Sequence, residues 1–464
     1  MREALARAGY TLLLRLVTPL YLLRLWWRGR RERGYRVAIG ERLGFGARPA
    51  PQPGALWLHA VSLGETRAAA PLVDALRRAR PGLRLLLTHG TATGREAGLA
   101  LLRDGDRQCW LPWDTPGAVR RFLHRQRPAI GVLMETEIWP NLLHAAAAQQ
   151  VPIVLANARL SERSLARGLR LRALMRPAAR RVALGLAQTE ADAVRLRAAG
   201  GARVEVCGNL KFDLEPPPAL VARGRAWRAA LGRPVVMAAS TREGEEAALL
   251  QSWCRLAAPR PLLLLVPRHP QRFDAVAEMV RQAGLALRRR SEWTEAPPAD
   301  AAGADVWLGD SMGEMALYYG SADVALLGGS FEPLGGQNLI EAAACGCPVV
   351  MGPHTFNFAQ AAELALAAGA AMRVADLDEG VAQAVALAGD AATQGGSEVG
   401  REAGGEAGGE AAGRSAHPSA CHGAHAAWRQ RALAFAGAHR GAAVRMAAAI
   451  LDIMDHPPPP AGAA

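Results

Sequence analysis

Short runs of apolar residues alternate with amphipathic helical patterns along most of the chain. In the first part these runs cover residues 56–61, 83–89, 130–134, 151–156, 182–187 and 203–208. They are continuously apolar, which is typical of parallel strands buried on both faces of a sheet. The alternation of such runs with helices predicts a doubly wound α/β sheet.

The same alternation restarts after a proline-rich segment. Apolar runs follow at 234–239, 261–266, 305–309, 323–328 and 348–352. The pattern therefore predicts two Rossmann-like doubly wound domains, at 37–214 and 225–455, joined by a linker at 215–224. Ligands of such sheets bind beyond the carboxyl ends of the strands, so we expect the site in a cleft that the two domains face.

One segment of the second domain has a different composition. Residues 391–425 include a glycine-rich stretch without large apolar side chains, which predicts a low-complexity insertion that cannot contribute to a core. The residues that could bind a metal adventitiously here are His417, Cys421, His422 and His425. Their low-complexity setting disfavours a specific metal site, and residues 456–464 are expected to form a tail.

The amino terminus carries an apolar stretch at residues 10–27, which is interrupted by Arg15, Pro19 and Arg24. Its length just reaches a membrane span. Trp26 and Trp27, followed by the arginines of 28–36, are typical of a membrane interface with a cytoplasmic positive flank. We expect residues 1–36 to be a membrane anchor that spans the bilayer or lies on it; an ordinary buried first helix is the alternative.

Composition and charge narrow the class of protein. Of the 464 residues 50% are hydrophobic and 21% charged, which disfavours wholesale disorder and a polytopic membrane protein. The formal net charge of +13 predicts an anionic partner, which could be a nucleic acid, an anionic leaflet or a phosphorylated substrate. The six cysteines contain no C-x-x-C pair, which disfavours a disulfide framework, a zinc ribbon and c-type haem.

Four candidate residues of the first domain follow predicted strands. Glu65 ends the motif SLGE at the start of a helix, where it is either a general base or a helix cap. Glu135 and Glu137 follow the run 130–134 and could bind a sugar or a partner, although Glu137 could equally cap a helix. Lys211, the only lysine of the chain, could neutralise a leaving phosphate or be a solvated surface lysine.

The second domain offers groups suited to anions. Arg268 and His269 follow a strand in a rigid PRHP turn, and Glu314 follows another strand, with Ser311 as the expected cap of the next helix. The glycine-rich segment 328–336 precedes a helix, so its backbone N–H groups could form an anion cradle. It is neither a Walker A loop nor a G-x-G-x-x-G fingerprint, so a nucleotide held by a single phosphate fits better than ATP.

A string of motifs resembles one family closely, namely HAVSLGE, METEIWPNL, GNLKFD, LVPRHPQRF, GDSMGEM and GGSFEPLGGQNLIEAAACGCPV. They are similar to those of the 3-deoxy-D-manno-octulosonic acid (Kdo) transferases of lipopolysaccharide assembly, in order along most of the chain. The resemblance implies a GT-B glycosyltransferase, anchored in the inner membrane with its catalytic domains on the cytoplasmic face. It also implies that CMP-Kdo is the donor, a lipid A precursor (lipid IVA) the acceptor, and the reaction an inverting, metal-independent single displacement.

The resemblance also implies roles for individual residues. Glu65 would be the general base, while Glu135 and Lys211 would stabilise the transition state. The residues that would hold CMP are Arg268, His269, Met312, Gly313, Glu314, Asn338, Leu339, Ile340 and Glu341. The expected partners are then CMP-Kdo, the lipid A precursor and an anionic leaflet, without nucleic acid and without a cofactor.

Two alternatives come from different classes of protein. Another GT-B transferase or a sugar-nucleotide epimerase would share the fold and the glycine-rich segment, but METEIWP and the amino-terminal segment disfavour it. A basic RNA- or membrane-binding protein without an active site would interleave aromatic residues with arginines. Aromatic residues make up only 5% of the chain and lie mostly within the motifs, which disfavours this reading.

Overall fold

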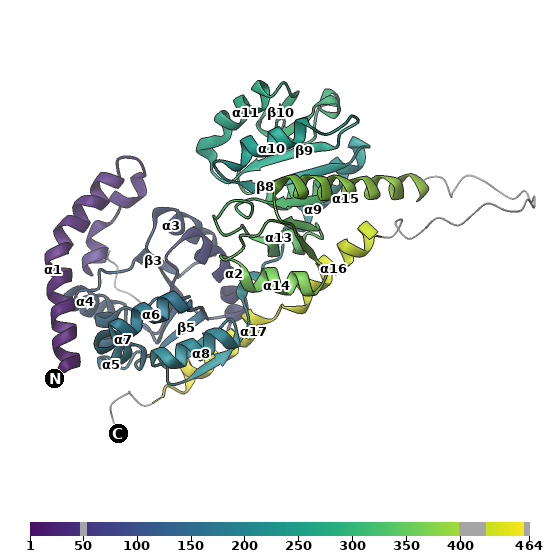
Figure 1. The fold of residues 1–464 in the computed structure, drawn as a ribbon. Helices are drawn as coiled ribbons and strands as arrows, with labels where there is room; N and C mark the ends of the chain where they lie inside the picture. The colour runs from purple at the N-terminus through teal and green to yellow at the C-terminus, as the bar shows by residue number, and fades with distance from the viewer. Residues whose placement is uncertain (47–52, 399–423, 459–464) are drawn as a thin grey trace, which may run out of the picture. The chain divides into compact units, whose positions relative to one another are not determined.

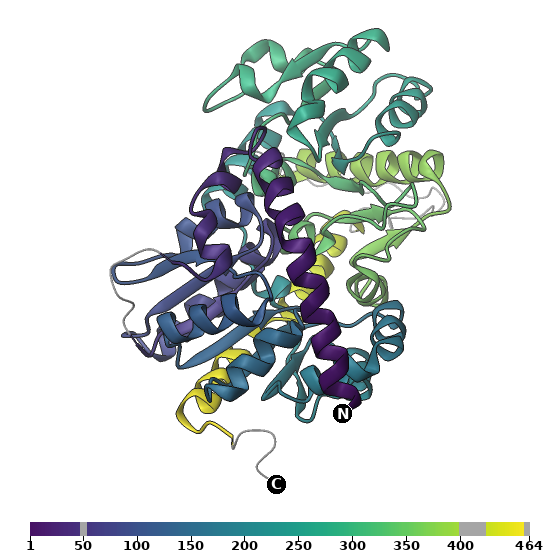
Figure 2. The same cartoon turned by 90° about the vertical axis from the view of Figure 1, so that its left-hand side faces the viewer.

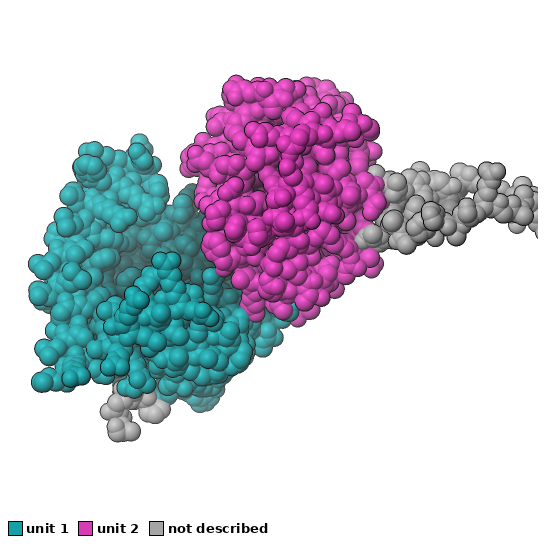
Figure 3. Space-filling view, in the orientation of Figure 1, with its two compact units in different colours: residues 1–214, 439–464 teal, residues 215–438 magenta. Residues whose placement is uncertain are grey.

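The structure is a computed structural model that describes residues 1–46, 53–398 and 424–458 (Figure 1). The chain divides into two compact units, which Figure 3 colours separately. Unit 1 contains residues 1–214 together with the segment that begins at His439, and unit 2 contains residues 215–438.

Unit 1 is built on seven parallel strands in the order β3-β2-β1-β4-β5-β6-β7. Their bounds are Leu56–His59 (β1), Leu85–His89 (β2), Arg107–Trp110 (β3), Ile130–Met134 (β4), Ile153–Ala158 (β5), Leu184–Ala187 (β6) and Val204–Val206 (β7). Successive strand residues point to opposite faces, so Leu56 and Leu58 join one core cluster and Trp57 joins the other.

Helices cover both faces of this sheet. Helices α2 (Leu63–Ala79) and α17 (Ala442–Asp455) contribute to the first cluster. The helices that contribute to the second are α4 (Pro116–Gln126), α5 (Pro140–Ala148), α7 (Arg172–Ala179) and α8 (Glu190–Ala199). Helices α3 (Ala92–Gly98) and α6 (Glu162–Arg170) and the short helices η3 (Leu99–Leu101) and η4 (Leu210–Asp213) complete the unit.

The last helix corrects the expected extent of the second domain, which was 225–455. Met446 and Ile450 of α17 are fully buried among side chains of β1, β2 and α2, so α17 belongs to unit 1. The carbonyl oxygen of Cys207, after β7, accepts hydrogen bonds from Arg445. The chain therefore returns to the first unit after it has completed the second.

Helix α1 (Arg2–Arg28) precedes the sheet and is followed by the short helices η1 (Arg33–Arg36) and η2 (Ile39–Leu43). It runs along the outside of unit 1 (Figure 2). The Tyr10 hydroxyl donates to Asp114 at 3.0 Å, and the Tyr21 ring stacks on Trp113 with ring centroids 3.9 Å apart. Leu25 is the only buried residue of α1, so the alternative of an ordinary buried helix is wrong. Within the described residues no helix combines the length and hydropathy needed to cross a membrane.

Unit 2 repeats the architecture with parallel strands in the order β10-β11-β9-β8-β12-β13-β14. The strands are Val235–Thr241 (β8), Leu262–Pro267 (β9), Leu287–Arg289 (β10), Val306–Leu308 (β11), Val324–Leu327 (β12), Val349–Met351 (β13) and Ala371–Arg373 (β14). The helices are Pro218–Leu231 (α9), Glu245–Cys254 (α10), Phe273–Gln282 (α11), Met315–Ser321 (α12), Leu339–Ala344 (α13), Ala359–Ala367 (α14), Leu377–Glu398 (α15) and Ala424–Ala438 (α16). Three short helices, η5 (Pro270–Arg272), η6 (Arg290–Glu292) and η7 (Ala299–Gly303), lie in its loops.

Two expected segments have different bounds in the structure. The linker predicted at 215–224 is helical from Pro218, and its Val221 and Gly224 are buried against α12. Of the insertion predicted at 391–425, residues 391–398 end α15, residues 424–425 begin α16, and the remainder lies outside the described residues with His417, Cys421 and His422. His425 is buried, with its Nε2 atom 2.8 Å from the carbonyl oxygen of Asp323.

Candidate active site

The candidate site of unit 1 lies where the strand order reverses. Strands β1 and β4 are neighbours, although the chain visits β2 and β3 on the other side of β1 before it reaches β4. Loops at the carboxyl ends of two such strands diverge and leave space for a ligand. Glu65 follows β1 and Glu135 follows β4, so both lie at this reversal point.

Glu65 is bound at the start of α2 by a reciprocal pair of hydrogen bonds with Ser62. The N–H of Glu65 donates to Ser62 Oγ at 3.3 Å, and the Ser62 hydroxyl donates to Glu65 Oε1 at 3.0 Å. The N–H of Val61 donates to Oε2 at 2.8 Å. Burial, with smaller contributions from the negative charges of Glu135 and Glu137, nevertheless raises the pKa of Glu65 from 4.5 to about 7. Glu65 is therefore hydrogen-bonded into the first turn of α2, where Ser62 is the N-cap, and its pKa also suits a base.

The backbone of Glu135 is strained. Its φ of 59° lies in the left-handed region, which is costly for a residue with a side chain. The N–H of Glu135 donates to Ala156 on the neighbouring strand at 2.9 Å, which holds this conformation. Glu137 accepts a hydrogen bond from Trp139 Nε1 at 2.6 Å. The N-cap residue of α5 is Trp139, so the alternative that Glu137 caps this helix is wrong.

Lys211 lies in η4, directly after β7. Its backbone N–H donates to Asn209 Oδ1, and the N–H of Leu210 donates to the side chain of buried Asn157, both at 3.0 Å. Burial lowers the pKa of Lys211, the negative charges of Glu135 and Glu65 raise it, and Arg159 lowers it. The structure thus brings Glu65, Glu135 and Lys211 together at one edge of the sheet, within electrostatic range of one another.

In unit 2 the corresponding reversal point lies between β8 and β12. Arg242 follows β8, and Arg268 and His269 follow the neighbouring strand β9. The N–H of Arg268 donates to the carbonyl oxygen of Thr241 at 2.9 Å, which joins the two strand ends. Burial and the positive charges of Arg242, Arg268 and Arg272 lower the pKa of His269, so this edge is positively charged.

Glu245 fixes the glycine-rich segment to this edge. Its buried carboxylate accepts the N–H of Gly329 at 2.7 and 2.8 Å and the N–H of Arg242 at 2.9 Å. Burial raises the pKa of Glu245, while the hydrogen bonds from Gly329, Arg242 and Phe331 lower it. Arg242 and Glu245 were missed from the sequence, although the motif STREGEE, directly after the run 234–239, is the signal that points to them.

The carboxylate of Glu314 is bound within unit 2. It accepts hydrogen bonds from Arg223 at 2.8 Å, from Arg290 at 2.9 Å and from the Ser311 hydroxyl. Burial acts to raise its pKa, but the bonds from Ser311 and Arg290 and the positive charges lower it below the usual value. The expectation that Ser311 caps α12 is wrong, because Glu314 itself precedes the first helical residue.

The other candidates of the donor side differ in accessibility. Met312 is exposed, and Gly313 has a φ of 82°, a conformation that favours glycine. Asn338 caps α13 by accepting the N–H of Ile340 at 3.2 Å. The side chains of Leu339 and Ile340 are buried in the core, so only Asn338 and half-buried Glu341 present polar side chains there.

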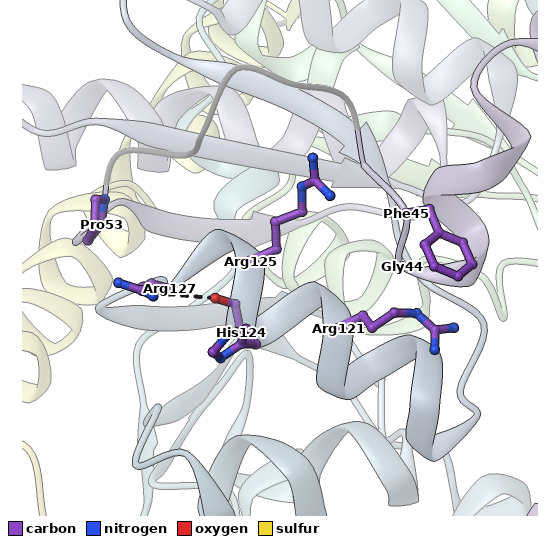
Figure 4. A pocket seen from close by; sticks show the side chains of 7 residues that line it. All are labelled: Gly44, Phe45, Pro53, Arg121, His124, Arg125 and Arg127. Carbon is purple, nitrogen blue, oxygen red and sulfur yellow. Dashed lines mark hydrogen bonds between the residues drawn. The ribbon is translucent and has the colours of Figure 1, made fainter.

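A pocket elsewhere on unit 1 contains none of the predicted residues. It lies near the amino ends of β1 and β4, the opposite edge from Glu65, and is lined by Gly44, Phe45, Pro53, Arg121, His124, Arg125 and Arg127 (Figure 4). The Arg121 guanidinium donates to the carbonyl oxygen of Leu43 and lies over the Phe45 ring. The three guanidinium groups point in different directions in Figure 4 and do not form one anion site.

Comparison with known proteins identifies the family. A family model described as 3-deoxy-D-manno-octulosonic-acid transferase (kdotransferase) matches residues 38–214. The chain is 51% identical to the 3-deoxy-D-manno-octulosonic acid transferase of Bordetella pertussis over 385 residues, which are 80% of this chain and 89% of the relative. The chain belongs to the Kdo transferase family. It is therefore a glycosyltransferase, as the motif resemblance predicts.

The chain is also similar to a second curated transferase and to solved structures. The Kdo transferase of Haemophilus influenzae is 38% identical over 76% of this chain and 83% of its own. The C-terminal CMP-Kdo binding domain of WaaA from Acinetobacter baumannii is 30% identical over 39% of this chain and 99% of that domain, with a TM-score of 0.35. Anabaena HepE in complex with UDP is similar in fold, with a TM-score of 0.52 at 13% identity over 86% of this chain and 99% of that chain.

Proposed function

We propose that this Kdo transferase uses CMP-Kdo as donor and a lipid A precursor, lipid IVA, as acceptor in lipopolysaccharide biosynthesis of a Gram-negative cell. The family name specifies the sugar, and the motif resemblance suggests both substrates. The observation that supports the chemistry best is Glu65, a carboxylate at the reversal point of the unit 1 sheet whose pKa is raised to about 7.

In the proposed reaction Glu65 is the general base. It takes the proton of the acceptor hydroxyl while the oxygen attacks the anomeric carbon of Kdo. The bond from the anomeric carbon to the phosphate oxygen breaks, its electron pair leaves with CMP, and the configuration inverts. A base works best when its pKa lies near the working pH, because it is then both deprotonated and basic enough to accept the proton.

Glu135 and Lys211 have complementary roles in this proposal. The transition state of a glycosyl transfer carries positive charge at the anomeric centre, which the carboxylate of Glu135 stabilises. Negative charge grows on the departing phosphate, which the ammonium group of Lys211 stabilises. The negative charge of Glu135 raises the pKa of Lys211, which supports the action of both groups at one site, and the reaction needs no metal ion.

The donor side of the proposal rests on unit 2. Arg268 and His269 bind the single phosphate of CMP at the positively charged edge of the sheet. Met312 and Gly313 contribute to CMP binding through an exposed loop. Glu314 contributes indirectly, because its carboxylate orients Arg223 and Arg290. Asn338, Leu339, Ile340 and Glu341 complete the surface at the start of α13, the two apolar residues through their backbone alone because their side chains are buried.

Helix α1 supports a further part of the proposal, which is attachment to the cytoplasmic face of the inner membrane. The exposed apolar residues of this helix include Leu12, Leu13, Leu16, Leu20, Leu23 and Trp27. The other side of α1 contacts the rest of unit 1 through Tyr10, Tyr21 and Leu25, which favours a helix that lies on the leaflet. Nucleic acid is not an expected partner.

The experiment that tests the function is a transfer assay in detergent micelles. The purified chain receives CMP-Kdo and a tetra-acylated lipid A precursor, and CMP release and the mass of the lipid are followed. We expect the wild type to add Kdo, and Glu65→Ala to bind CMP without turnover. If the wild type binds both substrates without transferring Kdo, the proposed substrates are wrong.

A further inference from the structure

A helical hairpin on unit 1 exposes leucines at its tip. Helix α6 ends at Arg170, α7 begins at Arg172, and Leu171 joins them. The side chain of Leu171 is 60% exposed and that of Leu169 is 48% exposed. Two large apolar side chains are thus exposed at or next to the turn that joins the two helices.

Arginines flank Leu171 in the sequence and lie along both helices of the hairpin. The exposed arginines of the hairpin are Arg163, Arg167, Arg170, Arg172 and Arg176. No carboxylate of the described residues forms a salt bridge with any of them. The hairpin has one acidic residue, Glu162, against these five arginines, so it presents a net positive charge around an apolar tip.

The hairpin lies beside α1. Helix α7 packs against both α1 and α5, and α6 packs against α7. Helices α5 and α7 belong to the core cluster on one face of the sheet, whereas α2 and α17 belong to the cluster on the opposite face. The hairpin and α1, which runs along the outside of unit 1 in Figure 2, therefore lie on the same face of the unit 1 sheet.

An anionic lipid surface matches this chemistry. Exposed leucines are removed from water at the boundary between headgroups and acyl chains, and arginines bind the lipid phosphates. A single-stranded nucleic acid would call for aromatic side chains on which bases stack, but residues 160–181 contain none. The combination of leucines and unpaired arginines thus favours lipid over nucleic acid.

We propose that the α6–α7 hairpin is a second membrane contact, in which Leu169 and Leu171 insert into an anionic leaflet while the surrounding arginines bind its phosphates. The inference rests on the proposed attachment through α1 and specifies how unit 1 is oriented on the leaflet.

An environment-sensitive fluorophore at the tip of the hairpin tests the inference in the full chain. Cys254, which is exposed, and Cys421, which lies outside the described residues, are first changed to serine. Leu171→Cys then carries the label. Val444→Cys is the matched control, because Val444 is 59% exposed and lies on α17, at the opposite face of the sheet.

Vesicles of phosphatidylglycerol and phosphatidylcholine are then added, and sedimentation is measured in parallel. We expect a blue shift and protection from iodide quenching at position 171, with no change at position 444. A protein that sediments with the vesicles while the label at 171 stays water-exposed retains the α1 attachment and overturns the hairpin inference. Failure to sediment at all would overturn both.

A second pair of variants tests the energetic role of the leucines. Leu169→Asp with Leu171→Asp should weaken vesicle binding at constant thermal stability, whereas Val444→Asp should leave it unchanged. Equal binding by both variants contradicts the inference. A concentration-dependent blue shift at position 171 without vesicles would show that a second copy of the chain covers the hairpin, which also contradicts it.

Discussion

Ser62 and Glu65 exchange hydrogen bonds at the start of α2, with the Glu65 N–H donating to Ser62 Oγ and the Ser62 hydroxyl donating to Glu65 Oε1. Ser62 is the N-cap of α2, so this pair stabilises the first turn of the helix. The same geometry holds the carboxylate in a half-buried position, where its pKa rises to about 7. The hydrogen bonds that stabilise the start of α2 thus also hold a carboxylate whose pKa would suit the proposed role as a base.

Replacement of Glu65 by glutamine should abolish its action as a base. The glutamine oxygen can accept the Val61 N–H while its NH₂ group donates to Ser62 Oγ, so the helix start survives, but the side chain cannot take a proton. We expect the turnover number to fall by about 10²–10⁴-fold, with CMP affinity unchanged. In the wild type the rate should rise with pH and reach half its maximum near the Glu65 pKa of about 7. A flat wild-type profile between pH 5.5 and about 8.5 would exclude Glu65 as the base.

The same variant should change how stability depends on pH. The pKa of Glu65 rises from 4.5 to about 7 on folding, so the native state holds this proton more tightly than the unfolded chain does. Its contribution to stability is then fully present below pH 4.5 and is lost as pH rises to about 7. Glutamine stays neutral, so the Tm of Glu65→Gln relative to wild type should increase between pH 5 and about 8. Calorimetry across this range measures it, and a decrease would contradict the raised pKa.

The substitution Glu135→Gly separates the effect of backbone strain on stability from the effect of the carboxylate on activity. Glu135→Gly relieves a φ of 59°, so the free energy of unfolding should be unchanged or rise by up to about 1 kcal/mol. Loss of the carboxylate should still lower the turnover number by about 10²-fold or more. The matched control is Gln150→Gly, which relieves a similar φ of 58° at an exposed residue and should leave activity intact. Full activity of Glu135→Gly would remove Glu135 from the mechanism.

Glu245 should organise the donor side of unit 2. In Glu245→Gln one of the two oxygens becomes an NH₂ group, which faces backbone N–H donors at Gly329 and Arg242. We expect a loss of about 1–3 kcal/mol in unfolding free energy, and a CMP affinity that falls by about ten-fold because the glycine-rich segment shifts. Titration calorimetry with CMP measures the second effect. Glu243→Gln, at a side chain that is 88% exposed, is the control and should bind CMP normally.

The strands of both sheets could be predicted where they are buried on both faces. Strand β4, at 130–134, has the bounds expected from its apolar run. The three strands that were missed, β3, β10 and β14, all lie at sheet edges. An edge strand has a solvent-exposed side and needs fewer apolar residues, as the half-exposed Leu287–Arg289 shows. Their sequences therefore lack the signal that the central strands carry.

Long-range partners account for the other differences. Prolines at 216–218 predict a linker, but a proline in the first turn is compatible with a helix, and Pro218 begins α9. The apolar pattern of 442–455 predicts a helix without indicating which sheet it covers. In the candidate site, the prediction that Glu65, Glu135 and Lys211 follow strands is confirmed. The binding of Glu314 by Arg223, in contrast, depends on residues far apart in the sequence.

The contact between α9 and α12 makes a strong prediction about stability. At Gly224 an added Cβ atom would lie 2.1 Å from the carbonyl oxygen of Leu317 and 2.9 Å from the N atom of Ser321. Backbone atoms cannot move aside as a flexible side chain would, so Gly224→Ala must push the two helices apart. We expect the free energy of unfolding to fall by about 1–3 kcal/mol or more, measured by chemical denaturation. Gly437→Ala is the matched control, because this helical glycine has no atom within 4 Å of the added Cβ. It should stabilise by up to about 1 kcal/mol, and equal effects of the two substitutions would contradict the close approach of α9 and α12.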